Sequence, residues 1–341
     1  MSLYSLYRPL IRPFMFMLDP EGAHNMVIKM GSMLSHGPLL SLFSQSVEER
    51  PCDVMGLHFK NPLGLAAGLD KNGDAIDYLG ALGFGYLELG TVTPKAQLGN
   101  EKPRMFRIVE ADGIINRMGF NNKGVDYLVS NLIKRKYKGI VGVSIGKNEV
   151  TSLNDAHLDY IYCMQKVYAY CDYIAINVSC PNTVGLTALQ DLEPLSKLLK
   201  VLKEEQQKLE LSYKKHVPLV VKMAPDLNTE QIEALCHSCL ENNIEGISCT
   251  NTTTRRDIIY GLNHASEWGG LSGRPLYALS NDVLKKVNSI IEGKIPLIGI
   301  GGISNAIEAR EKMSNGAELL QIYSSLIYKG PVVIRDIVNN L

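Results

Sequence analysis

Short apolar runs alternate with longer segments of mixed polarity along most of this chain, from about residue 51 to its end. Short runs with few charges are typical of strands that are buried on both faces of a parallel sheet. The longer segments place apolar residues at helical spacing and predict helices at 154–170, 192–211, 229–242, 277–291 and 305–313. The apolar runs predict strands at 62–67, 86–89, 140–145, 173–176, 219–222, 246–249, 296–300 and 319–323.

Eight such strand-and-helix units in about 280 residues predict an α/β fold of the (β/α)8 TIM-barrel type. A doubly wound sheet is the alternative, but its GxGxxG fingerprint is absent between the first strand and the first helix. The sequence Gly299-Ile-Gly-Gly302 comes late in the chain and lacks the third glycine at the required spacing. After the second strand, a long interruption at 92–120 contains short strands of its own around 105–108 and 114–116.

Two apolar stripes at helical spacing precede the barrel. They predict two short amphipathic helices within residues 1–45, ahead of a barrel domain at 46–341. Charged residues and prolines break the first segment well before the roughly 18 apolar residues of a membrane span, and no secretory cleavage site follows it. The pair can pack on the barrel as a cap, dip into a membrane surface, or line an apolar tunnel, and the sequence leaves these alternatives open. The stripes consist of Leu3, Tyr4, Tyr7, Leu10, Ile11 and Phe14, then of Met26, Val27, Met30, Met33 and Leu34.

Composition and charge argue against several classes of protein. With 341 residues, of which 45% are hydrophobic, the chain has ample material for a sizeable core. Its formal net charge of zero gives no sign of nucleic-acid binding through bulk electrostatics. Seven cysteines, an odd number at irregular spacing, argue against a disulfide framework and indicate a reducing compartment. Cys236 and Cys239 form a CxxC, but no second CxxC completes a zinc site, so helical thiols are the better interpretation.

Residues suited to a ligand follow every predicted strand. In a (β/α)8 barrel the carboxyl ends of the strands meet at one mouth, where active sites lie, so these residues are expected to converge. The small residues after the last two strands suit a phosphate. The segment 269–273 is interpreted as a loop that approaches a ligand closely, with a flexible linker as the alternative. In strand order the residues are Ala66 to Lys71; Gly90 and Thr91; Ser144 and Asn148; Asn177 to Asn182; Lys222; Thr250, Asn251 and Thr252; Gly301 and Gly302; Tyr323 and Ser324.

The six residues from Asn177 to Asn182 are the most informative of these strand ends. Two amides flank the thiol of Cys180. Amides can read a planar ligand rich in hydrogen-bonding groups, and a thiol can move a proton or attack as a nucleophile. An ordinary turn is the alternative, because Asn, Ser and Pro all form turns.

Two lysines are expected to reach the same mouth. Lys222 ends a very apolar strand, and Lys71 follows a glycine-rich turn. A buried ammonium requires an anionic or electron-rich partner, so the two suit an anionic substrate and a cofactor that gains negative charge. No histidine or carboxylate cluster follows a strand, which argues against a metal centre.

Seven segments of the chain resemble, in the same order, the motifs of the dihydroorotate dehydrogenase family. Several long motifs in fixed order are far more specific than a single glycine pattern. The N-terminal extension and the segments 116–122 and 250–253 resemble the membrane-associated, quinone-using class 2 enzymes. The resemblance implies bound FMN, (S)-dihydroorotate oxidised to orotate in pyrimidine synthesis, a membrane quinone as electron acceptor, and a peripheral location on the cytoplasmic side of the cell membrane. It rests on 66–71, 116–122, 177–182, 221–225, 250–253, 269–275 and 299–303.

The resemblance also implies roles for single residues. Cys180 would be the base that removes the C5 proton while hydride passes from C6 to the flavin, and Lys222 would stabilise the charge of the reduced flavin. Arg107 and Tyr323 would lie near the quinone path beside the N-terminal helices. FMN would be held by Ala66, Ala67, Gly68, Leu69, Asp70, Thr91, Ser144, Asn177, Lys222, Thr250, Gly273, Gly302, Tyr323 and Ser324. The substrate would be bound by Lys71, Asn116, Arg117, Met118, Gly119, Phe120, Asn177, Asn182, Asn251 and Thr252.

Two positions depart from the class 2 pattern. The base there is usually serine, whereas this chain has Cys180, as the soluble class 1 enzymes do, and a thiol with a reference pKa of about 8.5 is an easier base than a hydroxyl. Ser144 stands where the family usually has asparagine. Class 2 is favoured because class 1 chains lack the N-terminal hairpin. The alternatives are a class 1-like enzyme with a soluble acceptor such as fumarate or NAD, another flavin barrel, and a non-catalytic protein that kept the scaffold.

Overall fold

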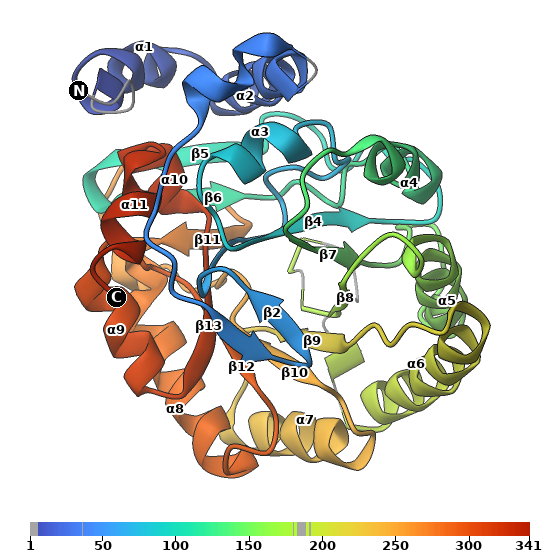
Figure 1. Cartoon of the computed structure of the whole chain (residues 1–341). Helices are drawn as coiled ribbons and strands as arrows, with labels where there is room; N and C mark the ends of the chain where they lie inside the picture. The colour runs from blue at the N-terminus through green and yellow to red at the C-terminus, as the bar shows by residue number, and fades with distance from the viewer. Residues whose placement is uncertain (1–5, 36, 180, 183–188, 191) are drawn as a thin grey trace.

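Eight parallel strands close into a barrel at the centre of the molecule (Figure 1). The computed structural model describes residues 6–35, 37–179, 181–182, 189–190 and 192–341. Each predicted strand is present within three residues of its expected bounds, so the predicted (β/α)8 barrel is confirmed. In chain order the barrel strands are β3 (Leu63–Leu65), β4 (Tyr86–Val92), β7 (Ile140–Ile145), β8 (Tyr173–Asn177), β9 (Leu219–Met223), β10 (Gly246–Cys249), β12 (Leu297–Ile300) and β13 (Ala317–Ile322).

Helices surround the barrel and bury its outer face. Alternate residues of one strand serve two cores: Leu87 and Leu89 of β4 pack against the helices, whereas Tyr86 points into the barrel, where it joins Val220 of β9. This double burial explains why the strands are apolar almost throughout. The helices are α3 (Ile76–Ala81), α4 (Val125–Lys134), α5 (Ala156–Val167), α6 (Leu192–Tyr213), α7 (Thr229–Glu241), α8 (Tyr277–Ile291), α9 (Ala306–Ser314), α10 (Ser324–Lys329) and α11 (Val332–Val338).

A hairpin that the sequence pattern did not predict packs over the amino-terminal end of the barrel. It consists of β1 (Cys52–Val54) and β2 (Leu57–Phe59), and it lies across the barrel in Figure 1. The fully buried ring of Phe59 meets the ring of Tyr86, the first residue of β4, edge-on with centroids 5.2 Å apart. With this end plugged by aromatic side chains, the interior is accessible from the carboxyl ends of the strands.

A second, three-stranded antiparallel sheet lies outside the barrel. It pairs β5 (Met105–Ile108) with β6 (Gly113–Asn116), as expected for the long interruption, and adds β11 (Gly270–Gly273). The prediction of a loop at 269–273 is therefore wrong: the backbone pairs with β6, and Leu271 forms a further bridge to Thr253. Glycine is usually disfavoured in strands, so the pairing was invisible in the local sequence.

The N-terminal segment packs on the barrel through small residues and some apolar ones, such as Leu34 and Phe43, and leaves many of its large apolar residues exposed. It contains the π-helical turn η2 (Tyr7–Ile11), α1 (Arg12–Met17), α2 (Pro20–Ser35) and the 3-10 turn η3 (Pro38–Phe43). Gly31 of α2 lies against α3 so closely that a Cβ there would be 2.7 Å from the ring of Tyr78. The predicted apolar stripe of α2 is divided: Met26, Met30 and Met33 are exposed, whereas Leu34 packs against the core.

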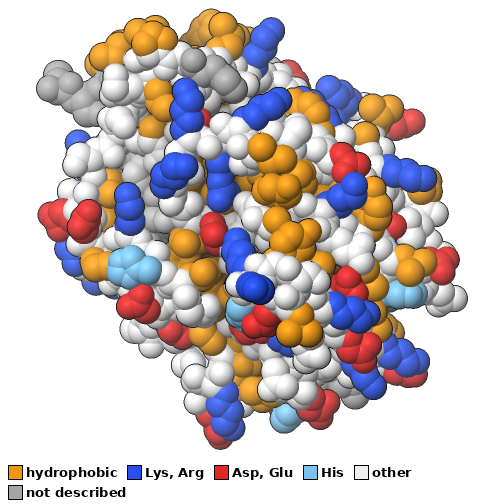
Figure 2. Space-filling view, turned by 45° about the vertical axis from the view of Figure 1, so that its right-hand side comes forward, with side chains coloured by type: hydrophobic (Ala, Val, Ile, Leu, Met, Phe, Trp, Pro, Cys, Tyr) orange, Lys and Arg blue, Asp and Glu red, His pale blue; other side chains and the backbone are white. Residues whose placement is uncertain are grey.

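Large hydrophobic side chains gather on the outer surface of this segment, at the top of Figure 2. Monomeric soluble proteins rarely expose a large contiguous apolar surface, so this one is a candidate contact site for a membrane or another partner. Among the described residues, no helix is both long and apolar enough to cross a bilayer. The exposed residues, here named the N-terminal apolar surface, are Leu6, Leu10, Ile11, Phe14, Met17, Met26, Met30, Met33, Leu39 and Leu42.

Candidate active site

A cavity of about 1220 Å³, open to solvent, lies at the carboxyl ends of the barrel strands beneath the second sheet. Most residues that the sequence placed at a ligand site do line it, from all strand ends except that of β7. Segments more than 250 residues apart in sequence thus converge on one space, as the barrel prediction required. The predicted residues found in the lining are Ala66, Ala67, Gly68, Lys71, Thr91, Asn116, Met118, Gly119, Phe120, Asn177, Asn182, Lys222, Thr250, Asn251, Thr252, Gly273, Gly302, Tyr323 and Ser324.

Three predicted residues lie behind the lining rather than in it. Leu69 belongs to the core between barrel and helices. Asp70 is buried, and its carboxylate accepts the backbone N–H groups of Asp74 and Ala75 at 2.9 and 2.8 Å. Burial raises the pKa of Asp70 to about 6, against the opposing effect of these two bonds. Ser144 reaches the cavity only through a partner, because its hydroxyl is hydrogen-bonded to that of Thr91 at 2.8 Å.

The side chain of Arg117 points away from the cavity. Its guanidinium pairs with Glu267 at 2.7 Å and lies over the rings of Phe106 and Trp268. It therefore joins the second sheet to the 254–268 segment, while its neighbours Asn116 and Met118 face the cavity. Cys180, the predicted base, lies outside the described residues.

A chain of polar side chains runs along one wall of the cavity. The amide of Asn177 donates to the hydroxyl of Thr91 at 2.8 Å, which in turn meets Ser144. On the other side, the amide of Asn251 donates to Ser179 at 3.0 Å and approaches the Asn177 carbonyl oxygen at 3.4 Å. These bonds fix the orientation of the Asn177 and Asn251 amides before any ligand is present, which is how a site becomes preorganised.

A second pair of amides lies opposite, at the edge of β6. Asn182 donates to the side-chain oxygen of Asn116 at 3.3 Å, and its own side-chain oxygen is buried without a hydrogen-bond partner among the described residues. The backbone oxygen of Asn182 accepts from Asn100, which ties this wall to the loop before β5. A buried, unpartnered amide oxygen in a cavity wall is suited to a ligand N–H group.

The part of the cavity at the carboxyl end of β12 combines a close-packed glycine turn with positively charged side chains. Gly302 has φ of 76°, and a Cβ there would lie 2.5 Å from the Cβ of Tyr277, so only glycine fits. Arg274 and Lys329 line the same cavity, and the Lys329 ammonium donates to the backbone oxygen of Ser304 at 2.6 Å. Small residues with nearby positive charge suit a phosphate group, as the sequence predicted for the last two strand ends.

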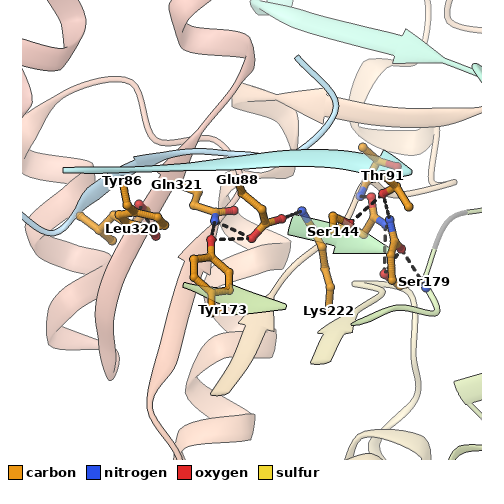
Figure 3. A network of polar contacts seen from close by, with 12 residues as sticks. Tyr86, Glu88, Thr91, Ser144, Tyr173, Ser179, Lys222, Leu320 and Gln321 are labelled. Carbon is orange, nitrogen blue, oxygen red and sulfur yellow. Dashed lines mark hydrogen bonds and ion pairs between the residues drawn. The ribbon is translucent and has the colours of Figure 1, made fainter. Parts of the chain in front are cut away.

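The floor of the cavity carries a buried ion pair, shown in Figure 3. The ammonium of Lys222 lies 3.6 Å from one oxygen of Glu88, and neither residue is appreciably exposed. The other carboxylate oxygen accepts from the Tyr173 hydroxyl at 3.0 Å and from the Gln321 amide at 2.8 Å. Lys222 and Gln321 line the cavity, whereas Glu88 lies beneath them.

Sequence reasoning missed several lining residues, among them Gln321, Ser325 and Tyr328. Gln321 stands at an inward, buried position of β13, whose other polar residue, Glu318, is exposed, and this exception was a usable signal. Glu88 gave the same signal in β4. Ser325 and Tyr328 belong to α10, where helical spacing does not reveal which side chains face a ligand. Their hydroxyl groups differ in hydrogen bonding. Tyr328 donates to the backbone oxygen of Gly113 at 2.7 Å, whereas the Ser325 oxygen is buried and unpartnered among the described residues.

Fold and cavity together define a (β/α)8-barrel protein with a preorganised polar ligand site at the carboxyl ends of its strands. The family model for dihydroorotate dehydrogenase matches residues 51–341. The chain therefore belongs to the dihydroorotate dehydrogenase family, and the resemblance stated from the sequence motifs is confirmed.

Relatives and solved structures agree with this assignment. The chain is 52% identical over 333 residues to dihydroorotate dehydrogenase (quinone) of Baumannia cicadellinicola subsp. Homalodisca coagulata, a match that covers 98% of this chain and 99% of the relative. It is 53% identical over 334 residues to the protein of the same name from Serratia proteamaculans (strain 568), with coverage of 98% and 99%. The crystal structure of DHODH in complex with ferulenol from Eimeria tenella superposes with a TM-score of 0.88 at 35% identity, over 94% of this chain and 90% of that one. Matches of this length include most of the N-terminal segment.

Proposed function

We propose that this protein oxidises (S)-dihydroorotate to orotate, with bound FMN as hydride acceptor and a quinone as final electron acceptor, in de novo pyrimidine synthesis. The observation that carries the proposal is the cavity at the strand ends, which residues of the family motifs line, next to an N-terminal segment that quinone-named relatives share. A soluble acceptor is less consistent with the exposed N-terminal apolar surface, which a fully soluble cycle does not require.

The residues of the cavity fit FMN. Gln321 and Ser325 line this space, and each has a buried side-chain oxygen without a partner among the described residues; these groups suit the hydrogen-bonding edge of a flavin and a phosphate respectively. The glycine and cation end described above suits the same phosphate. We assign FMN binding to Ala66, Ala67, Gly68, Thr91, Asn177, Lys222, Thr250, Gly273, Gly302, Tyr323 and Ser324. Leu69, Asp70 and Ser144, which lie behind the lining, are proposed to support this site rather than to line it.

When bound, FMN accepts hydride from the substrate and passes the electrons on to the quinone. The protein supplies position and charge. Lys222 holds a positive charge at the cavity floor, where it would stabilise the negative charge of a reduced flavin. Thr91, fixed by Asn177 and Ser144, presents a hydroxyl at the wall. Burial raises the pKa of Tyr323 to about 12, so its phenol stays neutral beside the glycine turn at Gly68.

The substrate is proposed to lie between the two amide pairs. Asn116 and Asn182 on one side, and Asn177 and Asn251 on the other, offer donors and acceptors in fixed orientations to a planar ring with alternating N–H and C=O groups. Lys71 lines the cavity and suits the substrate carboxylate. Met118, Gly119, Phe120 and Thr252 complete this wall, and Arg117 acts by supporting it rather than by contact. Cys180 is proposed as the base that removes the substrate C5 proton, on its motif position alone.

The quinone path is proposed to run between the cavity and the N-terminal helices. Tyr328 lines the cavity, and its ring meets that of Phe16 in α1 edge-on with centroids 5.4 Å apart. Arg107 lies over the other side of Phe16 and donates to the backbone oxygen of Leu18 at 2.9 Å. An aromatic contact thus links the flavin site to the segment that carries the N-terminal apolar surface. We propose that this surface inserts into the cytoplasmic face of the cell membrane as a peripheral contact.

Parallel assays of the purified protein test the proposal. We expect flavin absorbance bands that dihydroorotate bleaches and that a quinone restores, whereas fumarate and NAD do not. Asn182→Ala should raise the KM for dihydroorotate by roughly 10- to 100-fold, since a hydrogen bond to a charged ligand contributes about 1.5–3 kcal/mol. The matched control Asn154→Ala changes an exposed amide and should leave KM unaltered. A protein without flavin, or one reoxidised equally well by fumarate or NAD, would refute the proposal.

A further inference from the structure

Glu88 is a carboxylate in the interior of a closed barrel. It lies in the middle of β4, is 0% exposed, and has no place in the cavity lining. Isolated ionised carboxylates are costly to bury, so this side chain needs either compensating partners or a function that justifies the cost.

The partners of Glu88 fit an ionised carboxylate. Tyr173 and Gln321 both donate to one oxygen, at 3.0 and 2.8 Å, and the ammonium of Lys222 faces the other at 3.6 Å. Burial raises the pKa of Tyr173 well above its usual value, and the charge of Glu88 adds to this effect, so the phenol remains a donor. Figure 3 shows the four side chains directed toward one another from β4, β8, β9 and β13.

The contact between Glu88 and Lys222 is an ion pair but not a closed hydrogen bond. At 3.6 Å the facing carboxylate oxygen has no hydrogen-bond partner among the described residues. Among the described residues the Lys222 ammonium has no hydrogen-bond acceptor, so its N–H groups can serve a ligand in the cavity that Lys222 lines. A network whose only task was to fill the barrel would be expected to close its hydrogen bonds, because an unpartnered buried oxygen costs stability.

We propose that Glu88 is a positioning residue that holds the Lys222 ammonium under the cavity and sets the charge presented to the bound flavin. This inference rests on the proposed binding of FMN. The carboxylate partly neutralises Lys222, so the floor favours the negatively charged reduced flavin less than a lone lysine would. Glu88 thereby balances the two half-reactions: a stronger positive charge would ease reduction by the substrate and hinder reoxidation by the quinone.

The test compares the redox equilibrium of the bound flavin in variants of the purified holoenzyme. Glu88→Gln keeps the shape and the acceptor for Tyr173 but removes the charge. We expect its oxidised-to-reduced equilibrium to shift at least tenfold toward the reduced form, a rise of about 30 mV in midpoint potential for a two-electron couple. Potentials are measured by equilibration with a reference dye, which requires no turnover.

Tyr173→Phe is the matched control, because it removes a donor to the same carboxylate without changing the charge. We expect the oxidised-to-reduced equilibrium constant of the flavin in this variant to stay within threefold of the wild-type value, although its melting temperature falls. Glu88→Asp and Glu88→Asn form a second pair of equal size that differs in charge, and they give the same comparison if Glu88→Gln does not fold. Within each pair, the charged member is compared with the neutral one: wild type with Glu88→Gln, and Glu88→Asp with Glu88→Asn. Equal midpoint potentials in both comparisons would show that Glu88 only fills the barrel. Absence of FMN from the wild-type protein would instead refute the proposed function itself.

Discussion

The carboxylate of Glu21 in α2 and the guanidinium of Arg104 form a buried ion pair that joins the N-terminal helices to the wall of the cavity. Two bonds connect them, at 2.7 and 3.1 Å, and both side chains are almost fully buried. Arg104 also donates to the backbone oxygen of Asn100 at 2.8 Å, and the Asn100 amide donates to that of Asn182 at 3.2 Å. The N-terminal segment is therefore not an independent appendage, since it supports the loop that contacts Asn182, a residue proposed to bind the substrate.

Glu21→Gln should destabilise the protein through this pair. The change leaves the Arg104 charge buried with a neutral partner, and breaking a buried pair typically costs about 3–5 kcal/mol. We expect a loss of about 3 kcal/mol in the free energy of unfolding by urea, together with a higher KM for dihydroorotate. Glu48→Gln is the control, because its pair with Arg50 at 3.2 Å is exposed and should contribute less than about 1 kcal/mol. Equal, small losses in both variants would contradict the prediction.

Cys180 can be tested although it lies outside the described residues. As the proposed base, Cys180→Ala should slow flavin reduction by dihydroorotate at neutral pH by roughly 100-fold or more, the usual contribution of a general base, while FMN stays bound. Cys180→Ser should retain activity with a pH optimum moved upward, because a hydroxyl ionises less readily than a thiol. Stopped-flow absorbance measures both. Cys52→Ser, in the hairpin at the opposite end of the barrel, is the control, and rapid reduction by the alanine variant would exclude Cys180 as the base.

Much of the barrel was predictable because its strands are buried on both faces. Burial makes a strand such as Leu297–Ile300 apolar throughout, and this signal is local. The β1–β2 hairpin was not predicted, since strands of three residues carry too little pattern and Phe59 owes its position to a distant partner, Tyr86. The strand Gly270–Gly273 was missed for a related reason: its pairing with β6 is set by tertiary contacts that override the low strand propensity of glycine.

The residues of the candidate site were predictable where their backbone position alone brings them to the cavity. They were less predictable where a long side chain can reach several different partners. Asn177 and Asn182 reach the cavity because they end or follow a barrel strand. Arg117 was expected at the substrate, but its flexible side chain instead reaches Glu267 and two aromatic rings. Glu88 was overlooked because a single acidic residue in an apolar strand does not reveal its partner. Its role can be inferred only from the fold, in which β4 and β9 bring it to Lys222.

Lys312 predicts a pH dependence of stability. It is fully buried in α9 and donates to Ser280 and Asn281 at 2.7 and 2.8 Å, and Ser280 in turn donates to the backbone oxygen of Gly301. Burial lowers its pKa to about 7, although Cys249 and the neighbouring glutamates oppose the shift. Between about pH 7 and the ordinary lysine pKa of 10.5, the unfolded chain binds a proton that the folded chain lacks. The free energy of unfolding due to this residue therefore increases with pH in that window and is constant below it.

The comparison of wild type with Lys312→Met isolates this contribution. From pH 7 to 9, we expect the free energy of unfolding of wild type to increase relative to that of the variant by about 1 kcal/mol per pH unit. The maximum slope for one proton is about 1.4 kcal/mol per pH unit. Urea denaturation at three pH values measures it, and other titrating groups cancel because both proteins carry them. Parallel stability curves would show that the Lys312 pKa lies outside this range.

The N-terminal apolar surface should determine quinone access and membrane binding, without affecting the first half-reaction. Removing residues 1–36 would be a poor test, because it also removes Glu21 and strands the buried charge of Arg104. Substitution of exposed residues avoids this problem. Leu10, Phe14 and Met17 are 63%, 55% and 80% exposed, so changing all three to serine should alter stability by little more than a few tenths of a kcal/mol each.

We expect this triple variant to bind vesicles of bacterial-type phospholipids at least tenfold more weakly, since burying a large apolar side chain contributes roughly 1.5–3 kcal/mol when complete. Its KM for a long-tailed quinone should rise, while flavin reduction by dihydroorotate and reoxidation by a small soluble dye stay unchanged. The control changes Ile133, Leu211 and Ile307, exposed by 59%, 81% and 70% on α4, α6 and α9, to serine. If both variants bind vesicles and use the long-tailed quinone as wild type does, the surface is only a packing cap, and the membrane contact has to be sought elsewhere on the protein.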